Sequence, residues 1–106
     1  MKVIKQEVVQ TCSKNVVSVK DFEEEFYRVE KIRIIVRKSL KEKVPIYPFI
    51  RGAKKDQSLT KFVKQRLTCL TDNDIEFVIF DGLSRTPHGR TLLGTIRYSY
   101  KEKEEG

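Results

Sequence analysis

The chain has 106 residues and a mass of 12.5 kDa, which is room for one domain. Hydrophobic residues make up 39% and charged residues 35% of it, so the sequence predicts a small core beneath a highly charged surface. No apolar run approaches the roughly 20 residues that a bilayer span needs, which excludes a membrane-spanning helix. The opening MKVIKQEVVQ alternates charged and apolar residues, unlike a signal peptide, and we expect a soluble, cytoplasmic protein.

The charge balance points to acidic partners. Lysine and arginine number 22 against 15 acidic residues, which gives a formal net charge of +7 and a pI of about 9.5. Such a charge favours nucleic acid, an anionic membrane surface or an acidic protein segment, and it does not choose among them. Cys12 and Cys69 are too few and too separated for a zinc site or a disulfide framework, so we expect two reduced structural thiols.

The first half of the chain predicts one helix and two strands. Residues 1–10 suit a strand or an ordered arm, and residues 11–17 suit a connector. From the capping residue Ser18, apolar residues recur at spacings of three and four, which predicts an amphipathic helix ending before Ile32: Val19, Phe22, Phe26 and Val29. The period then becomes two over residues 32–36, which predicts a half-buried strand. Residues 44–50 are extended, and their two prolines favour an edge strand.

The second half begins with a basic loop, residues 51–57, and continues with the clearest helix. This helix starts at Ser58 and carries one apolar stripe: Leu59, Phe62, Val63, Leu67 and Leu70. Residues 75–80 are the most hydrophobic strand, residues 83–93 form a long loop, and the alternation over residues 94–100 predicts a last strand.

The predicted order is an N-terminal arm (residues 1–17) and an α+β domain (residues 18–106) that starts with a helix. From Lys31 onward the order is ββαββ, which is typical of a β-grasp or of a split ferredoxin-like domain.

Three segments, taken in order, resemble one family. FEEEFYRVEKIR precedes an extended KVP, DQSLTKFVKQRL gives a cap and an apolar-x-x-aromatic helix, and EFVIFDGLSRTPHGRTLLGTIRYSYKEKEEG gives a strand, a proline-containing loop and a charged turn ending in glycine. Over roughly residues 22–106 this arrangement looks like the autophagy ubiquitin-like modifiers, which include GABARAP-type proteins conjugated to lipid and a sibling conjugated to a protein. The resemblance implies a ubiquitin-like β-grasp with an N-terminal helix.

Two registers of this resemblance are open. In one, residues 44–50 are the family's first strand and the second strand is missing. In the other, which we prefer, residues 32–36 are the first strand and residues 44–50 the second, because this register uses every apolar alternation.

The C-terminus departs from the family. The resemblance implies one more strand after the charged turn and then a conjugated glycine, whereas this sequence stops at Gly106. Either the chain is truncated, or Gly106 is a displaced conjugation site, or this is a divergent member that does not conjugate. Residues 1–10 are a candidate to fill the missing strand's place, and an open sheet edge would permit a homodimer by strand exchange.

The resemblance also implies binding of short aromatic-x-x-aliphatic peptides, which add a strand to the edge of the second strand. Carried over by position, the peptide-binding residues are Ile46, Tyr47, Phe49, Ile50, Arg51, Lys54, Leu59, Phe62, Val63 and Arg66. Pro48 lies on the same edge and removes a donor, and Lys55 adds to the basic side chains that would meet acidic flanks. The alternative is that Leu59, Phe62 and Val63 simply fill the core.

No residues group into a catalytic or metal-binding pattern. His88 lies on a proline-containing loop without a partner nucleophile, and we expect an exposed loop histidine. Asp72, Asp74 and Asp81 suit turns and strand ends. The sequence therefore predicts a binding protein without cofactors, not an enzyme. The resemblance implies that its partners are motif-bearing proteins and ubiquitin-like conjugation enzymes, with membrane association through lipid conjugation.

The alternative is a small basic nucleic-acid-binding α+β domain. Basic residues recur across the predicted strands, helix and loops, and Tyr47, Phe49, Tyr98 and Tyr100 lie among them. A sheet face with these aromatic residues would stack bases while the cations hold phosphates.

Overall fold

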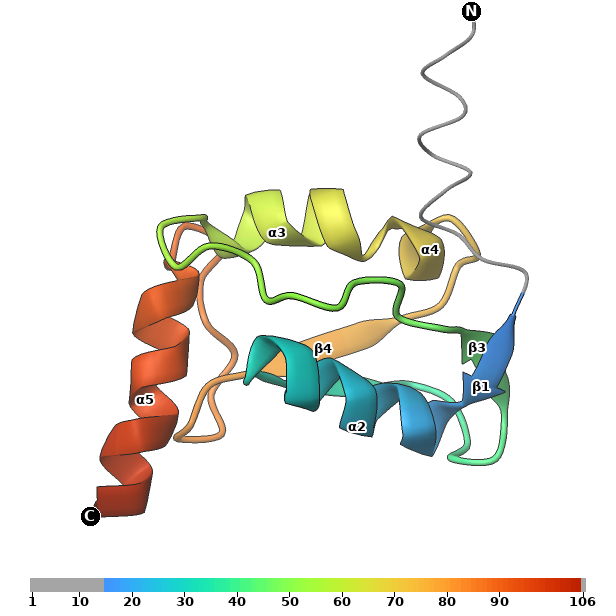
Figure 1. Ribbon diagram of the computed structural model, residues 1–106, viewed down its shortest axis with the longest axis horizontal. Coiled ribbons are helices and arrows are strands. Elements are labelled where there is room, and N and C mark those ends of the chain that lie inside the picture. Colours follow the sequence, from blue (N-terminus) through green and yellow to red (C-terminus); the bar gives the residue numbers. More distant parts are fainter. Residues whose placement is uncertain (1–14, 106) are drawn as a thin grey trace, which may run out of the picture.

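This computed structural model describes residues 15–105, with side chains as far as Lys101, and they form short strands and helices (Figure 1). The elements in chain order are β1 (Val16–Ser18), α2 (Val19–Glu30), β2 (Arg33–Val36), β3 (Lys43–Pro45), α3 (Leu59–Arg66), α4 (Thr68–Thr71), β4 (Phe77–Phe80) and α5 (Leu93–Glu105). β1 pairs with β3 and β2 pairs with β4, both antiparallel. This arrangement confirms the α+β class.

The N-terminal helix, α2, forms as the sequence predicts. The Ser18 side chain accepts a hydrogen bond of 3.1 Å from the amide of Asp21, which caps the first turn. Lys31 ends the helix in the left-handed conformation, with a φ of 62°, and its amide donates to the carbonyl of Tyr27. The predicted apolar stripe is buried throughout: Val19, Phe22, Phe26 and Val29.

The β2–β4 pair lies behind α2 in Figure 1, in register with Arg33 opposite Phe80 and Val36 opposite Phe77. Ile34 and Val36 are buried, whereas Arg33 and Ile35 are exposed, which confirms the predicted half-buried strand. At one end of the pair the hydroxyl of Tyr100 donates to the carbonyl of Phe80 and accepts from the amide of Arg33 at 2.9 Å.

The prediction of a strand at residues 94–100 is wrong, because this segment belongs to α5. Leu93, Ile96 and Ser99 are buried at spacings of three, so a helical face packs onto the rest of the domain. The approach is close: a Cβ on Gly82 would lie 2.4 Å from the carbonyl oxygen of Ser99, so only glycine fits there.

Two further boundaries differ from the prediction. The strand expected over residues 44–50 ends at Pro45, because Tyr47 turns into the core and Pro48 has no amide to donate. The helix expected from Ser58 to Leu70 breaks at Leu67 into α3 and the short α4.

An aromatic cluster joins α2, the extended segment after β3, and α3. The ring of Phe26 lies 4.9 Å from that of Tyr47 and 6.0 Å from that of Phe62, measured between centroids, and both pairs meet edge to face. Phe26 and Phe62 are fully buried, so this cluster is the centre of the core.

The strands of residues 15–105 form two separate pairs rather than one sheet, so the predicted ββαββ order is not found in this part of the chain. The predicted strand or arm at residues 1–10 and the glycine at 106 lie outside the described residues. Cys69 is disulfide-bonded, which corrects the prediction of a reduced thiol at this position. None of the described helices has the length and apolar character needed to cross a bilayer.

Candidate functional site

A buried carboxylate, Glu30, lies at the last turn of α2 and is surrounded by donors. The hydroxyl of Tyr47 donates to Oε2 at 2.5 Å, and Nη1 of Arg66 lies 2.8 Å from the same oxygen. The other oxygen, Oε1, accepts from the amide of Ala53 at 2.9 Å and from Nη2 of Arg97 at 2.8 Å. Each carboxylate oxygen therefore accepts two hydrogen bonds from groups inside the protein.

The two arginines of this set are also fixed elsewhere. Arg97 donates from Nε to the carbonyl of Glu30 at 2.7 Å and from Nη1 to the carbonyl of Ala53 at 2.8 Å. Arg66 donates to the carbonyl of Arg51, and its guanidinium lies 4.3 Å from the ring centre of Phe49. We call Glu30, Tyr47, Ala53, Arg66 and Arg97 the Glu30 network; it ties α2, α3, α5 and the loop before α3 together.

The Glu30 network is closed and structural. Burial raises the pKa of Tyr47 well above its ordinary value of 10.0, and the hydrogen bond to the Glu30 carboxylate raises it further, against a smaller lowering by Arg66. The phenol therefore stays a proton donor to Glu30 at any physiological pH. With Glu30 fully buried and both its oxygens occupied, the network offers a ligand no open position.

The network encloses part of the peptide-binding set expected from the sequence. Tyr47, Leu59 and Phe62 are buried in the core, and Val63 packs against it, as in the alternative considered for α3. The remaining members point in several directions, since Ile50 is 83% exposed while Phe49 lies under Arg66. Ile46 lines a shallow depression beside α2, and Arg51 and Lys54 are exposed in the loop.

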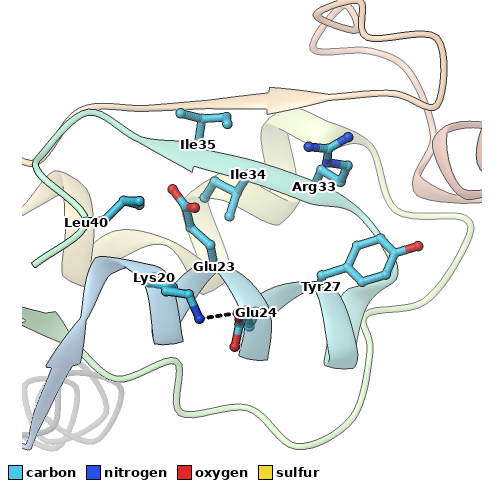
Figure 2. A pocket seen from close by; sticks show the side chains of 8 residues that line it. All are labelled: Lys20, Glu23, Glu24, Tyr27, Arg33, Ile34, Ile35 and Leu40. Atoms are coloured by element: carbon cyan, nitrogen blue, oxygen red, sulfur yellow. Dashed lines mark hydrogen bonds and ion pairs between the residues drawn. The ribbon is translucent and has the colours of Figure 1, made fainter.

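An open apolar groove lies instead between α2 and the outer edge of β2 (Figure 2). It encloses about 480 Å³. We call it the α2–β2 groove, and its lining residues are Lys20, Glu23, Glu24, Tyr27, Arg33, Ile34, Ile35 and Leu40. Ile35 is 41% exposed and Leu40 is 56% exposed, so hydrophobic surface is open to solvent here.

The backbone edge of β2 faces this groove. Within residues 15–105, β4 is the only strand paired with β2, so its other edge carries no strand. Figure 2 shows the Glu23 side chain pointing from α2 towards β2. Its carboxylate accepts a hydrogen bond of 2.9 Å from the amide of Val36. A short extended chain would find both apolar anchors and backbone partners there.

The aromatic residues expected to form one nucleic-acid-binding sheet face do not lie together. Tyr47 and Phe49 are in contact beside Arg66, whereas Tyr98 and Tyr100 lie on α5.

No cluster of metal ligands occurs within the part of the chain that the structure describes. His88 is an exposed loop residue, as predicted, and its Nδ1 accepts from the amide of Arg90. Asp81 accepts from the amides of Leu83 and Arg85 and pairs with the Arg85 guanidinium. Burial raises the pKa of Asp81, and these amides and Arg85 lower it by more, so its pKa lies below the ordinary value.

Comparisons with protein-family models, with curated proteins and with solved structures found no match for this chain.

The Glu30 network was missed from the sequence although a signal for it exists. Glu30 follows Phe22 and Phe26 at intervals of four, which places it on the buried face of α2. A carboxylate at such a position needs cationic partners, and the chain has many to choose from.

Proposed function

We propose that this protein is a peptide-binding adaptor whose α2–β2 groove takes short extended segments with one aromatic and one aliphatic anchor. The observation that carries the proposal is a β2 edge on which no strand of residues 15–105 pairs, with exposed apolar side chains beside it. Strand addition uses backbone hydrogen bonds for affinity and alternate side chains for specificity, and both elements are at hand in this groove.

Each part of the groove has a place in this scheme. Ile35 and Leu40 supply apolar contact for an aliphatic side chain, and the ring of Tyr27, which is 39% exposed, supplies a surface for an aromatic one. The exposed Arg33 would attract acidic residues that flank the motif. Lys20 would attract such residues less, because its ammonium group already pairs with the Glu24 carboxylate at 2.9 Å.

Glu23 makes the edge selective. The Val36 carbonyl already accepts from the amide of Lys38, so an incoming strand must displace Glu23 from the Val36 amide or pair with the backbone of Ile34. The edge is thus protected from random pairing until a segment with matching anchors arrives.

The setting of this proposal is autophagy, as a ubiquitin-like modifier or adaptor, and it rests on the sequence resemblance alone. Conjugation at Gly106, the conjugating enzymes and a lipid-linked form belong to the same proposal, and a cytoplasmic location fits it. The two separate two-stranded sheets of residues 15–105 add no support for the β-grasp itself.

The test is an NMR titration of labelled protein with a Trp-x-x-Leu peptide that has acidic flanks. We expect shifts at the amides of residues 33–36 and along the groove face of α2, with saturation in the micromolar to low millimolar range. A peptide with both anchors changed to alanine is the ligand control.

Two variants decide which surface binds. Ile35→Glu places a charge in the α2–β2 groove, whereas Ile50→Glu makes the same change at an exposed site among the residues expected from the sequence. Loss of binding with Ile35→Glu alone supports the proposal. Loss with Ile50→Glu alone would instead favour the surface at residues 46–50.

A further inference from the structure

A second groove lies between the C-terminal end of α2 and the face of α5, and its lining is basic and aromatic. It encloses about 660 Å³, within the range of roughly 300–1,000 Å³ that is typical of ligand sites. We call it the tyrosine–lysine groove, lined by Tyr27, Lys31, Lys55, Gly94, Arg97, Tyr98, Tyr100 and Lys101. No carboxylate belongs to this described lining.

The cations of this groove fall into two kinds. Arg97 donates one hydrogen bond from each of its three guanidinium nitrogens to Glu30 or Ala53, so its guanidinium is fixed within the Glu30 network. Lys31, Lys55 and Lys101 are exposed and belong to none of the ion pairs found among the described side chains. Three ammonium groups are therefore available to a ligand with several negative charges.

Of the tyrosines in this groove, one is held within the fold and another is open to a ligand. Tyr100 is held by its hydroxyl between β2 and β4, and its ring meets that of Tyr27 edge to face at 6.1 Å. Tyr98 is 59% exposed, which leaves its ring open to stacking. Aromatic surfaces of this kind next to lysines are typical of sites that bind unpaired bases and their phosphates.

The geometry points to single-stranded nucleic acid as the ligand of the tyrosine–lysine groove. The phosphates would lie against Lys31, Lys55 and Lys101, and a base would stack on Tyr98. A duplex keeps its bases stacked internally and makes no use of Tyr98, and an acidic peptide or an anionic membrane supplies charge but no base. This inference stands apart from the peptide-binding proposal, because the two grooves share only Tyr27 and the residues that hold the nucleic acid are all outside the α2–β2 groove.

The experiment is fluorescence anisotropy with a labelled 12-nucleotide oligo(U) and oligo(dT), over a range of salt concentrations. Removing two phosphate contacts with Lys55→Gln/Lys101→Gln should lower the salt slope by about 1.4, since each contact contributes about 0.7 on a single strand. Tyr98→Ala should weaken binding about tenfold or more by removing a stacking surface. The matched control, Lys61→Gln/Lys64→Gln, removes the same charge from the exposed face of α3 and should leave the slope unchanged.

Equal effects of the two double variants would overturn the inference, because binding would then follow net charge alone. So would unchanged binding by Tyr98→Ala, or tighter binding to a matched duplex, to polyglutamate or to phosphatidylserine vesicles than to the single strands. The same variants should bind the Trp-x-x-Leu peptide as the wild type does, and Ile35→Glu should bind the oligonucleotides as the wild type does. Either proposal can therefore fail while the other stands.

Discussion

Two regions of this protein each gather several cations, and they treat them in opposite ways. In the Glu30 network, two arginines turn inward onto one buried carboxylate, and hydrogen bonds fill both of its oxygens. In the tyrosine–lysine groove, three lysines face solvent and make no ion pair with any described side chain. Arg97 belongs to both regions, because its guanidinium holds Glu30 and the residue also lines the groove.

The difference separates charge that holds the fold from charge that is available for binding. A buried ion pair costs desolvation and is tolerated only when every polar atom has a partner, which is the state of Glu30. Solvated lysines cost little to the folded state and little is gained by pairing them, so their grouping around exposed tyrosines has no structural requirement behind it. Substitutions in the two regions should therefore affect different measurements.

The largest effect is expected from Glu30→Gln. The variant keeps the shape of the side chain but leaves two largely buried guanidinium groups without a counter-charge, which should lower the free energy of unfolding by about 3–5 kcal/mol. Urea denaturation measures this. Glu24→Gln, which loses only the exposed pair with Lys20, is the matched control and should cost less than about 1 kcal/mol. Similar losses in both variants would contradict the structural role of the network.

A smaller loss, about 1–3 kcal/mol, is expected from Arg97→Lys. Lysine keeps the charge beside the groove but cannot reproduce three hydrogen bonds in one plane. Unfolding should become easier while the salt slope of oligonucleotide binding stays the same. The reverse pattern, with wild-type stability and a reduced slope, would mean that Arg97 serves the ligand rather than Glu30.

Tyr47→Phe should cost about 1–2 kcal/mol at neutral pH, because one donor to the Glu30 carboxylate is removed. It should also change the alkaline limb of stability. The pKa of Tyr47 is higher in the folded state than in the unfolded state, so the unfolded chain loses its proton first. The stabilisation is therefore complete below about pH 10 and declines as the pH rises towards the folded-state pKa. Measured by urea denaturation between pH 8 and 11, the free energy of unfolding should fall less steeply with pH for the variant than for the wild type. Equal slopes would contradict the role given to Tyr47.

The smallest effect on stability is expected from Lys55→Gln/Lys101→Gln, within about 0.5 kcal/mol of wild type. Both side chains are exposed, and glutamine keeps the Cβ that Lys55 places against Gly94. Thermal unfolding of the variant checks this value. A larger loss would show that these lysines support the docking of α5, and that the contrast between the two regions is not as sharp as the geometry indicates.

The sequence predicts an element correctly where the spacing of its apolar residues fits only a helix or only a strand, and fails where the spacing fits both. α2 was predictable because its buried residues, its Ser18 cap and its end all agree. α5 was not, because residues 94–100 alternate in polarity while Leu93, Ile96 and Ser99 are also spaced as one helical face. Leu93 is the residue that distinguishes the two patterns, because it extends the helical face and has no place in the alternation of residues 94–100.

The candidate sites were less predictable than the elements, since they depend on which segments meet. The sequence grouped Tyr98 and Tyr100 with Tyr47, Phe49 and basic residues as an alternative nucleic-acid-binding set. It gave no sign that Tyr27 and Lys31, at the end of α2, lie beside the two tyrosines of α5. It also placed Tyr47 at a peptide-binding edge, although this residue is a donor to a buried carboxylate. Such long-range partners follow from packing and have no local pattern.

Tyr27 has a position that joins the two grooves. It lines both the α2–β2 groove and the tyrosine–lysine groove, and its ring touches that of Tyr100, whose hydroxyl holds the amide of Arg33 at the end of β2. A ligand that fixes this pair of rings in one groove also fixes a wall of the other. If both grooves bind their proposed ligands, this shared wall is the route by which one ligand would affect the other, and by reciprocity any such change in affinity would be the same in both directions.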